Sequence, residues 1–273
     1  MAARGTDDLV YGRYARRQPL GRGGFGVVWR AHDTLLQRDV AIKEIELPGV
    51  LDPADVAALR EKVLREARTA ARLSHPGAVT VYDVIEEDGR PLIVMELVDA
   101  PTLADLVERE GPFSDRRAAT IGLEVLDTLT AAHGRGIVHR DVKPANVMIN
   151  PEGRVQLADF GIASIIDDPK VTSSGAVAGS PSYMAPEQAQ SHGTGPATDL
   201  WGLGATLYFA VEGVAPFDKG AAIPTLTAVV NEPPRAIERA TILGPLIGDL
   251  LAKDPEARPD PGDVRRRLEE VLA

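Results

Sequence analysis

This sequence of 273 residues contains no cysteine, no basic block and no apolar run long enough to cross a bilayer. The absence of cysteine excludes disulfides, thiol chemistry and cysteine-based zinc sites. The net charge is −10, and the few arginines near the N-terminus are too sparse to indicate nucleic-acid binding. The most apolar stretch, Leu200 to Val211, indicates a buried helix. Since the N-terminus also lacks a signal-like apolar region, we expect a cytoplasmic protein with no membrane segment in this chain.

The remaining composition is ordinary for a globular protein, with 44% apolar and 26% charged residues. A chain of this length forms either one large domain or two lobes with an ample core. Strand-like segments prevail from Tyr14 to Leu97, and the polar break Asp99-Ala-Pro predicts a hinge. Helices are predicted over 52–73, 102–109, 114–133, 222–230, 241–252 and 260–271.

The segment His139-Arg-Asp-Val-Lys-Pro-Ala-Asn146 gathers polar side chains between two apolar runs. It offers the carboxylate of Asp141, the ammonium of Lys143 and the amide of Asn146. Ionisable groups beside buried strands are costly unless they serve a function. Because Pro144 bars a regular helix, we expect these groups on a fixed loop. A second carboxylate follows in Asp159-Phe-Gly, again after an apolar strand.

Two features of the first hundred residues point to an anion site. The glycines of Gly21-Arg-Gly-Gly-Phe-Gly26 let a hairpin approach an anion closely. Alone, they fit a plain hairpin or a dinucleotide site equally well, but a strand follows, which disfavours the dinucleotide site. Lys43 would by itself be a surface lysine. Glu66, however, lies within the apolar stripe of the predicted helix and needs a cation, so we predict a Lys43–Glu66 pair.

Together these motifs resemble those of the protein kinase superfamily. The chain is identified as a member of the actinobacterial-type branch of the bacterial eukaryotic-like Ser/Thr protein kinases, over about residues 14–268. The resemblance implies an α+β, bilobal fold. A flexible N-terminus (1–13) would precede a small β-rich N-lobe with one helix (14–98) and a larger helical C-lobe (99–273).

The resemblance also implies a transferase that moves the γ-phosphate of ATP to Ser/Thr hydroxyls of proteins. Asp141 would be the base, Lys143 would stabilise the transferred phosphate, and Lys43, held by Glu66, would contact the α- and β-phosphates. Mg²⁺ (or Mn²⁺) would be held by Asn146 and Asp159. The ATP-binding residues that it implies are Leu20, Gly21, Arg22, Gly23, Gly24, Phe25, Gly26, Val27, Val28, Ala41, Lys43, the gatekeeper Met95, Glu96, Val98 and Met148.

Further residues match the family's regulatory and anchoring positions. Arg140 would bind a phosphate on the activation loop, where Thr172, Ser173 and Ser174 are the candidate phosphorylation sites. Asp199 would hold the backbone of the catalytic loop, although read alone it could be a helix N-cap. Glu187 would pair with Arg258. Two departures are Ser180, where threonine is usual, and Ser164, where relatives often carry a basic residue.

Two other readings stay open at this point. A pseudokinase would bind partners without phosphoryl transfer, but such proteins usually lack the lysine or one of the two aspartates that are present here. A small-molecule phosphotransferase would lack the Glu187, Asp199 and Arg258 anchors. Expected partners are Ser/Thr-containing proteins, ATP and a kinase homodimer for trans-autophosphorylation. The native protein is expected to be cytoplasmic, either alone or as the cytoplasmic domain of a larger membrane receptor kinase.

Overall fold

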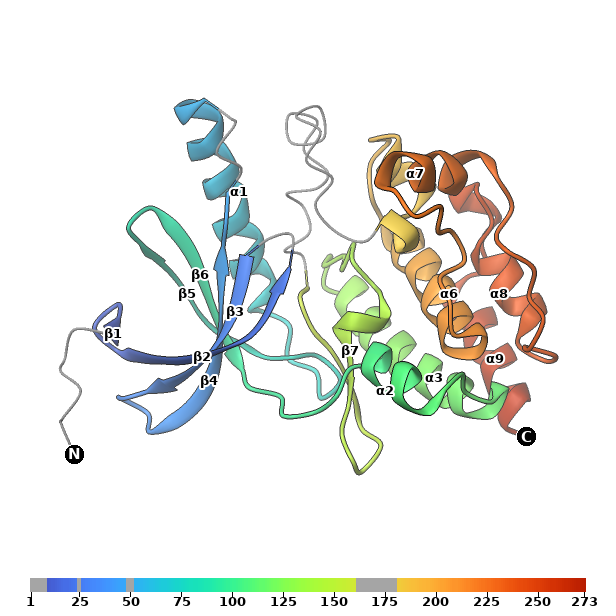
Figure 1. Ribbon diagram of the computed structural model, residues 1–273, viewed down its shortest axis with the longest axis horizontal. Helices are drawn as coiled ribbons and strands as arrows, with labels where there is room; N and C mark the ends of the chain where they lie inside the picture. The colour runs from blue at the N-terminus through green and yellow to red at the C-terminus, as the bar shows by residue number, and fades with distance from the viewer. Residues whose placement is uncertain (1–8, 24–25, 48–51, 161–180) are drawn as a thin grey trace.

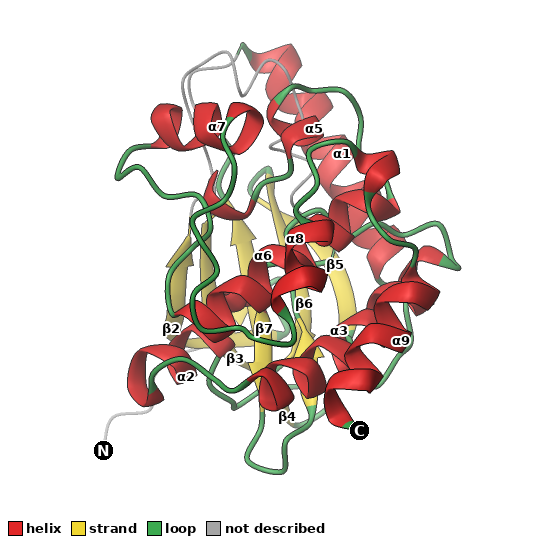
Figure 2. Cartoon of the chain, turned by 90° about the vertical axis from the view of Figure 1, so that its right-hand side faces the viewer, coloured by secondary structure: helices red, strands yellow, loops and turns green. Residues whose placement is uncertain are grey.

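The computed structural model describes residues 9–23, 26–47, 52–160 and 181–273. The six-stranded sheet and helix α1 form one lobe and most of the other helices form the second, joined by the segment after β6 (Arg90–Glu96) (Figure 1). Viewed from the helical side, the helices lie in front of the strands (Figure 2). The predicted bilobal α+β fold is confirmed.

The smaller lobe is built on an antiparallel sheet whose described strands run in the order β1-β2-β3-β4-β6-β5. Neighbours in the chain pair as hairpins, except where β4 pairs with β6. This crossover places Lys43 of β4 opposite Ile93, next to the strand that leads to the hinge. The strands are β1 (Leu9–Val10), β2 (Tyr14–Gly23), β3 (Gly26–Asp33), β4 (Arg38–Ile45), β5 (Val81–Glu87) and β6.

The N-terminal prediction needs correction over residues 9–13. We expected a frayed terminus over 1–13, but Leu9 and Val10 form β1 against β2. Val10 is buried in an apolar cluster with Tyr14. Arg13 makes two hydrogen bonds, of 2.9 and 2.7 Å, to the fully buried Asp33. Burial of Val10 and this ion pair therefore order the segment, and neither is evident from local composition. Residues 1–8 lie outside the described part.

Helix α1 (Pro53–Ala70) packs on the sheet against β5 and β6. Asp52 caps it by accepting from the backbone N–H groups of Ala54 and Asp55, with proline at the first turn as predicted. Its buried face, Leu59, Val63, Leu64, Ala67 and Ala70, follows the helical period. The predicted helix is present and ends three residues before the expected Leu73.

The larger lobe surrounds α6 (Pro196–Glu212), which is buried along most of its length. Gly202 is required in α6, because a Cβ there would lie 2.7 Å from the Cβ of Val142. The helix therefore packs directly against the loop that carries Asp141.

Of the described helices, none combines the length and apolar character that crossing a membrane requires. The other helices are α2 (Leu103–Glu110), α3 (Asp115–His133), α5 (Pro186–Ala189), α7 (Ala222–Asn231), α8 (Gly244–Leu250) and α9 (Pro261–Leu272).

A buried ion pair joins α5 to the segment before α9. Arg258 donates two hydrogen bonds of 2.8 Å to the carboxylate of Glu187, and their side chains are 0% and 9% exposed. Arg258 also donates to the backbone oxygen of Ala197 at 2.7 Å, and Thr198 donates to Glu187 at 2.9 Å. Burial raises the pKa of Glu187, but these bonds lower it by more, so it titrates below its ordinary range. The expected ion pair is present.

We predict that Arg258→Ala lowers the free energy of unfolding by roughly 3–5 kcal/mol, because Glu187 then stays buried without its cation. Urea denaturation measures the change. Arg266→Ala is the matched control, since its partners Asp263 and Glu270 lie on the exposed surface of α9; it should cost no more than about 1 kcal/mol. Equal stability of the two variants would contradict the prediction.

Candidate active site

The loop from His139 to Asn146 is held by one buried carboxylate. Asp199 of α6 accepts from the backbone N–H of His139 at 2.8 Å and of Arg140 at 2.7 Å. Its Oδ2 also lies 2.7 Å from Nε2 of His133, at the end of α3. Arg140 has φ +69°, a left-handed conformation that a non-glycine residue adopts only under constraint. The side chain of Asp199 therefore anchors the loop backbone, as the motif implies, and is more than an N-cap.

The polar residues of this loop converge on Asp141. Nζ of Lys143 lies 2.6 Å from Oδ2 of Asp141. The amide nitrogen of Asn146 donates to the backbone oxygen of Asp141 at 2.8 Å and to its Oδ2 at 3.1 Å. Because the nitrogen of Asn146 makes both bonds, its Oδ1 is left to face a ligand. The sequence spacing thus produces one compact cluster of a carboxylate, an ammonium and an amide.

The ring of His139 hydrogen-bonds to the backbone beside this cluster. Its ring is fully buried, and Nδ1 accepts from the backbone N–H of Asp141 at 3.1 Å. Nε2 must then carry the proton that it donates to the backbone oxygen of Ala158 at 2.7 Å. Phe160 packs edge-on against it at 4.5 Å between ring centroids. Burial lowers the pKa of His139, so the ring stays neutral and acts in packing.

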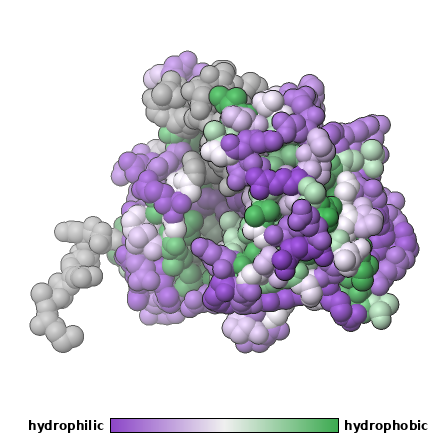
Figure 3. Space-filling model, turned by 45° about the vertical axis from the view of Figure 1, so that its right-hand side comes forward, coloured by the Kyte–Doolittle hydropathy of each residue, from purple (hydrophilic) through white to green (hydrophobic). Residues whose placement is uncertain are grey.

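A cleft of about 560 Å³ opens beside this loop, between the two lobes. The surface is hollowed there, with apolar and polar residues around the hollow (Figure 3). Asn146 and Asp159 both line this cleft, together with hinge residues that include Glu96 and Val98. The predicted nucleotide contacts that line it are Leu20, Gly21, Val28, Ala41, Met95, Glu96, Val98 and Met148.

A family profile described as protein kinase domain matches residues 14–267. The chain belongs to the protein kinase family. Among its curated relatives is the serine/threonine-protein kinase PknA of Mycobacterium tuberculosis, 39% identical over 254 residues, which are 90% of this chain and 58% of PknA. PkaA of Streptomyces coelicolor is 35% identical over 281 aligned positions, 96% of this chain and 50% of PkaA. PknB of M. tuberculosis is 38% identical over 264 aligned positions, which are 93% of this chain and 42% of PknB.

These relatives confirm the predicted actinobacterial-type Ser/Thr kinase branch. The chain spans about half the length of the curated relatives that it matches.

The expected Lys43–Glu66 pair is wrong for this structure. Nζ of Lys43 lies 2.7 Å from Oδ2 of Asp159, and Glu66 instead receives a hydrogen bond of 2.9 Å from Arg140. Glu66 does have a cationic partner, as expected, but that partner is Arg140. Arg140 offers a planar fork suited to a carboxylate, while Lys43 neutralises Asp159. Burial raises the pKa of Asp159, but the nearby positive charges of Lys43 and Lys143 contribute to a larger opposite shift, so the pKa lies below its ordinary value.

Other predicted nucleotide residues lie outside the cleft lining. Arg22 is on the exposed hairpin, 3.3 Å from Glu46. Gly26 has φ +129°, and a Cβ there would lie 1.8 Å from the backbone oxygen of Glu44. This glycine is therefore required for packing on β4, whatever it does toward phosphate. Gly23, Val27 and Lys43 also do not line the cleft, and Gly24 and Phe25 lie outside the described residues.

Several lining residues were missed, among them Arg30, Val79, Asp99, Ala145 and Ala158. Ala145 and Ala158 directly precede Asn146 and Asp159, so adjacency to the metal motif could have indicated them. Arg30 could not have been found, because it reaches the cleft through strand register. It is held by Asp39 at 2.8 Å, which also contacts His32.

The two expected magnesium ligands have suitable chemistry. Asn146 and Asp159 both line the cleft and offer the hard oxygen atoms that Mg²⁺ prefers. The part of the chain that the structure describes contains no group of three or more His, Cys, Asp or Glu side chains placed to hold a metal. One carboxylate and one amide fit a metal that keeps several waters and is shared with phosphate oxygens.

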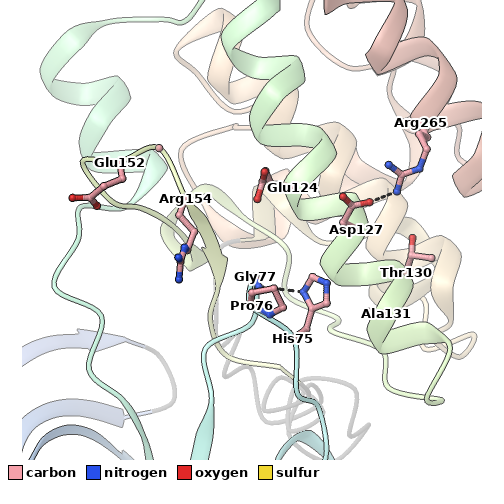
Figure 4. A pocket seen from close by; sticks show the side chains of 11 residues that line it. His75, Pro76, Gly77, Glu124, Asp127, Thr130, Ala131, Glu152, Arg154 and Arg265 are labelled. Atoms are coloured by element: carbon pink, nitrogen blue, oxygen red, sulfur yellow. Dashed lines mark hydrogen bonds and ion pairs between the residues drawn. The ribbon is translucent and has the colours of Figure 1, made fainter.

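A second hollow, of about 820 Å³, lies between the α1–β5 loop, α3 and the turn between β7 (Val147–Ile149) and β8 (Val155–Leu157). Figure 4 shows Asp127 and Arg265 pointing toward one another as an ion pair across its edge. His75 accepts from the backbone N–H of Gly77. None of the predicted site residues lines this hollow. We therefore assign it no part in phosphoryl transfer, although its volume exceeds that of the cleft.

We predict that Glu66→Ala and Arg140→Ala are non-additive in the unliganded protein, with a coupling of roughly 0.5–1 kcal/mol, because they remove the same ion pair. A double-mutant cycle by urea denaturation measures it. The matching cycle on Lys43 and Glu66 should be additive within about 0.5 kcal/mol. Coupling in the second cycle but not in the first would restore the pairing expected from the sequence.

Proposed function

We propose that this chain is a protein kinase domain that transfers the γ-phosphate of ATP to Ser/Thr hydroxyls of proteins. The observation that carries the proposal is the cluster of Asp141, Lys143 and Asn146 on an anchored loop, beside a cleft that Asn146 and Asp159 line. The printed names of the relatives, serine/threonine-protein kinases, support the same chemistry.

Each residue has a role that follows from its chemistry. Asp141 orients the acceptor hydroxyl and takes its proton. Lys143, 2.6 Å from Asp141, brings a positive charge to the transferred phosphate. The hinge residues Glu96 and Val98 line the cleft, where their backbone groups suit an adenine edge. Asn146 and Asp159 hold the divalent metal, Mg²⁺ or Mn²⁺, which neutralises triphosphate charge when bound.

We infer that the observed ion pairs exchange when nucleotide binds. Oδ2 of Asp159 is held by Lys43 at 2.7 Å, so Lys43 must turn away from Asp159 to contact the phosphates. When Lys43 turns to the phosphates, Glu66 is the remaining acidic residue that the family motif supplies to hold it. Glu66 must then leave Arg140. We infer that the described arrangement is a resting state, and a ligand that binds the alternative pairing better would shift the equilibrium toward it.

We also propose a cytoplasmic location, with this chain as the kinase part of a larger protein, since its relatives extend well beyond the matched region.

Incubation with [γ-³²P]ATP, Mg²⁺ and a generic basic protein tests the activity. Labelled protein supports it, nucleotide binding without labelling indicates a pseudokinase, and labelling of a small molecule alone indicates a small-molecule phosphotransferase.

We predict that Asp141→Asn lowers turnover by roughly 10²–10⁴-fold, the usual effect of a lost general base. Nucleotide affinity should change little, because Asp141 faces the acceptor. Initial-rate kinetics and nucleotide titration measure the two effects. Asp127→Asn is the control, since Asp127 pairs with Arg265 outside the cleft. Near-normal turnover of Asp141→Asn would remove Asp141 from the mechanism.

We predict trans-autophosphorylation within a kinase homodimer on Thr172, Ser173 or Ser174, with Thr172 the leading candidate; all three lie outside the described residues. Arg140 is suited to bind the added phosphate with its planar fork, which would also release Glu66. Because Ser164, likewise outside the described residues, replaces a basic partner, the triple alanine variant should retain part of the activity. Phosphopeptide mapping after incubation with Mg-ATP identifies the site. Unchanged activity of the variant would show that phosphate has no role.

A further inference from the structure

The outer face of α1 carries an unusual arrangement of positive charge. Arg65 and Arg68 of α1 and Arg72, in the turn that continues from it, are all exposed, and at 3.6 residues per turn they fall within about 60° of arc. They form a single ridge about 10 Å long, which we call the arginine ridge. Figure 1 shows α1 beside the sheet, well apart from α6, α8 and α9.

The arginine ridge has no partner among the described residues. None of its three side chains forms an ion pair or a hydrogen bond there, whereas most arginines of this chain do. Glu61 is placed one turn before Arg65, a spacing that often gives an ion pair, yet no such pair forms. A row of three unpaired guanidinium groups costs repulsion among like charges that the chain does not relieve.

Helix geometry explains only part of this row. Cations near a helix C-terminus are favoured by the helix dipole, but the effect is confined to the last turn. It therefore accounts for Arg68 and for Arg72 just beyond the helix. It does not account for Arg65, nor for the alignment of all three on one ridge.

The charge of the whole chain narrows the choice of partner. At a net −10, the protein repels acidic molecules over most of its surface, so attraction is confined to local positive features. A long polyanion such as nucleic acid would meet that repulsion beyond the ridge. A short acidic segment, with carboxylates spaced over two helical turns, matches the ridge in both length and sign.

We propose that the arginine ridge is a docking site for an acidic helical segment of another protein. The site does not depend on the phosphoryl-transfer chemistry, so binding is measurable without ATP. A segment bound there touches the same helix that carries Glu66, and thus acts on the element whose glutamate exchanges partners.

Fluorescence anisotropy with a labelled, alanine-based peptide of about fifteen residues, bearing glutamates along one face, tests the proposal. We expect saturable binding to the 273-residue chain that weakens as salt shortens the Debye length below about 10 Å. The triple variant R65E/R68E/R72E should bind at least about tenfold more weakly, because like charges then face the peptide. R65Q/R68Q/R72Q, which places no acid near the helix C-terminus, should also bind more weakly.

The matched control is R17E/R154E/R239E. These three arginines are exposed, form no ion pair with a described residue, and lie on different elements, so the control makes the same change in net charge. It should bind the peptide within about twofold of the unaltered chain. Absence of saturable binding, or an equal loss in the control, would overturn the proposal. An oligonucleotide of equal charge that displaces the peptide would overturn it in favour of nucleic acid.

Discussion

The side chain of Asp199 is the constraint on which the active site depends. Its carboxylate is 1% exposed and accepts two backbone hydrogen bonds from the loop and one contact from His133. Bonds to a charged acceptor contribute about 1.5–3 kcal/mol each, which offsets the order of 1–3 kcal/mol for the left-handed backbone of Arg140. Gly202 and Val142 lock the same helix to the same loop. Asp141 is therefore positioned by α6, a helix that supplies no catalytic group.

Four charged groups, of which Asp159 lines the cleft, form two ion pairs: Lys43 with Asp159, and Arg140 with Glu66. When these groups exchange partners, two ion pairs are replaced by other ion pairs. The free energy of the exchange is therefore a difference between ion-pair energies of similar size. Their side chains are between 10% and 25% exposed, which keeps each term modest. Such an equilibrium responds to any ligand that prefers one arrangement, by as much as its two affinities differ.

Sequence reasoning succeeded where a local pattern determines the outcome. The cap at Asp52, the buried stripe of α1 and the loop around Pro144 each follow from a few neighbouring residues. It failed where several partners compete. Glu66 needed a cation, but the choice between Lys43 and Arg140 depends on distances set by the whole fold. Arg30 reaches the cleft through strand register, and Val10 is ordered by a strand that follows it. These are tertiary effects that no local pattern encodes.

Helix α1 carries both Glu66 and the arginine ridge, and its opposite sides have different surroundings. The segment that follows α1 is tied to β8, where the backbone of Leu157 bonds to Gly77 at 2.7 Å and to Val79 at 3.0 Å. A Cβ at Gly77 would lie 2.1 Å from Oγ1 of Thr128 on α3, so this attachment is close. Glu66 and the arginine ridge are about 100–160° apart around the axis. A segment on the ridge therefore leaves Glu66 uncovered, so any influence on the partner of Glu66 passes through α1 itself.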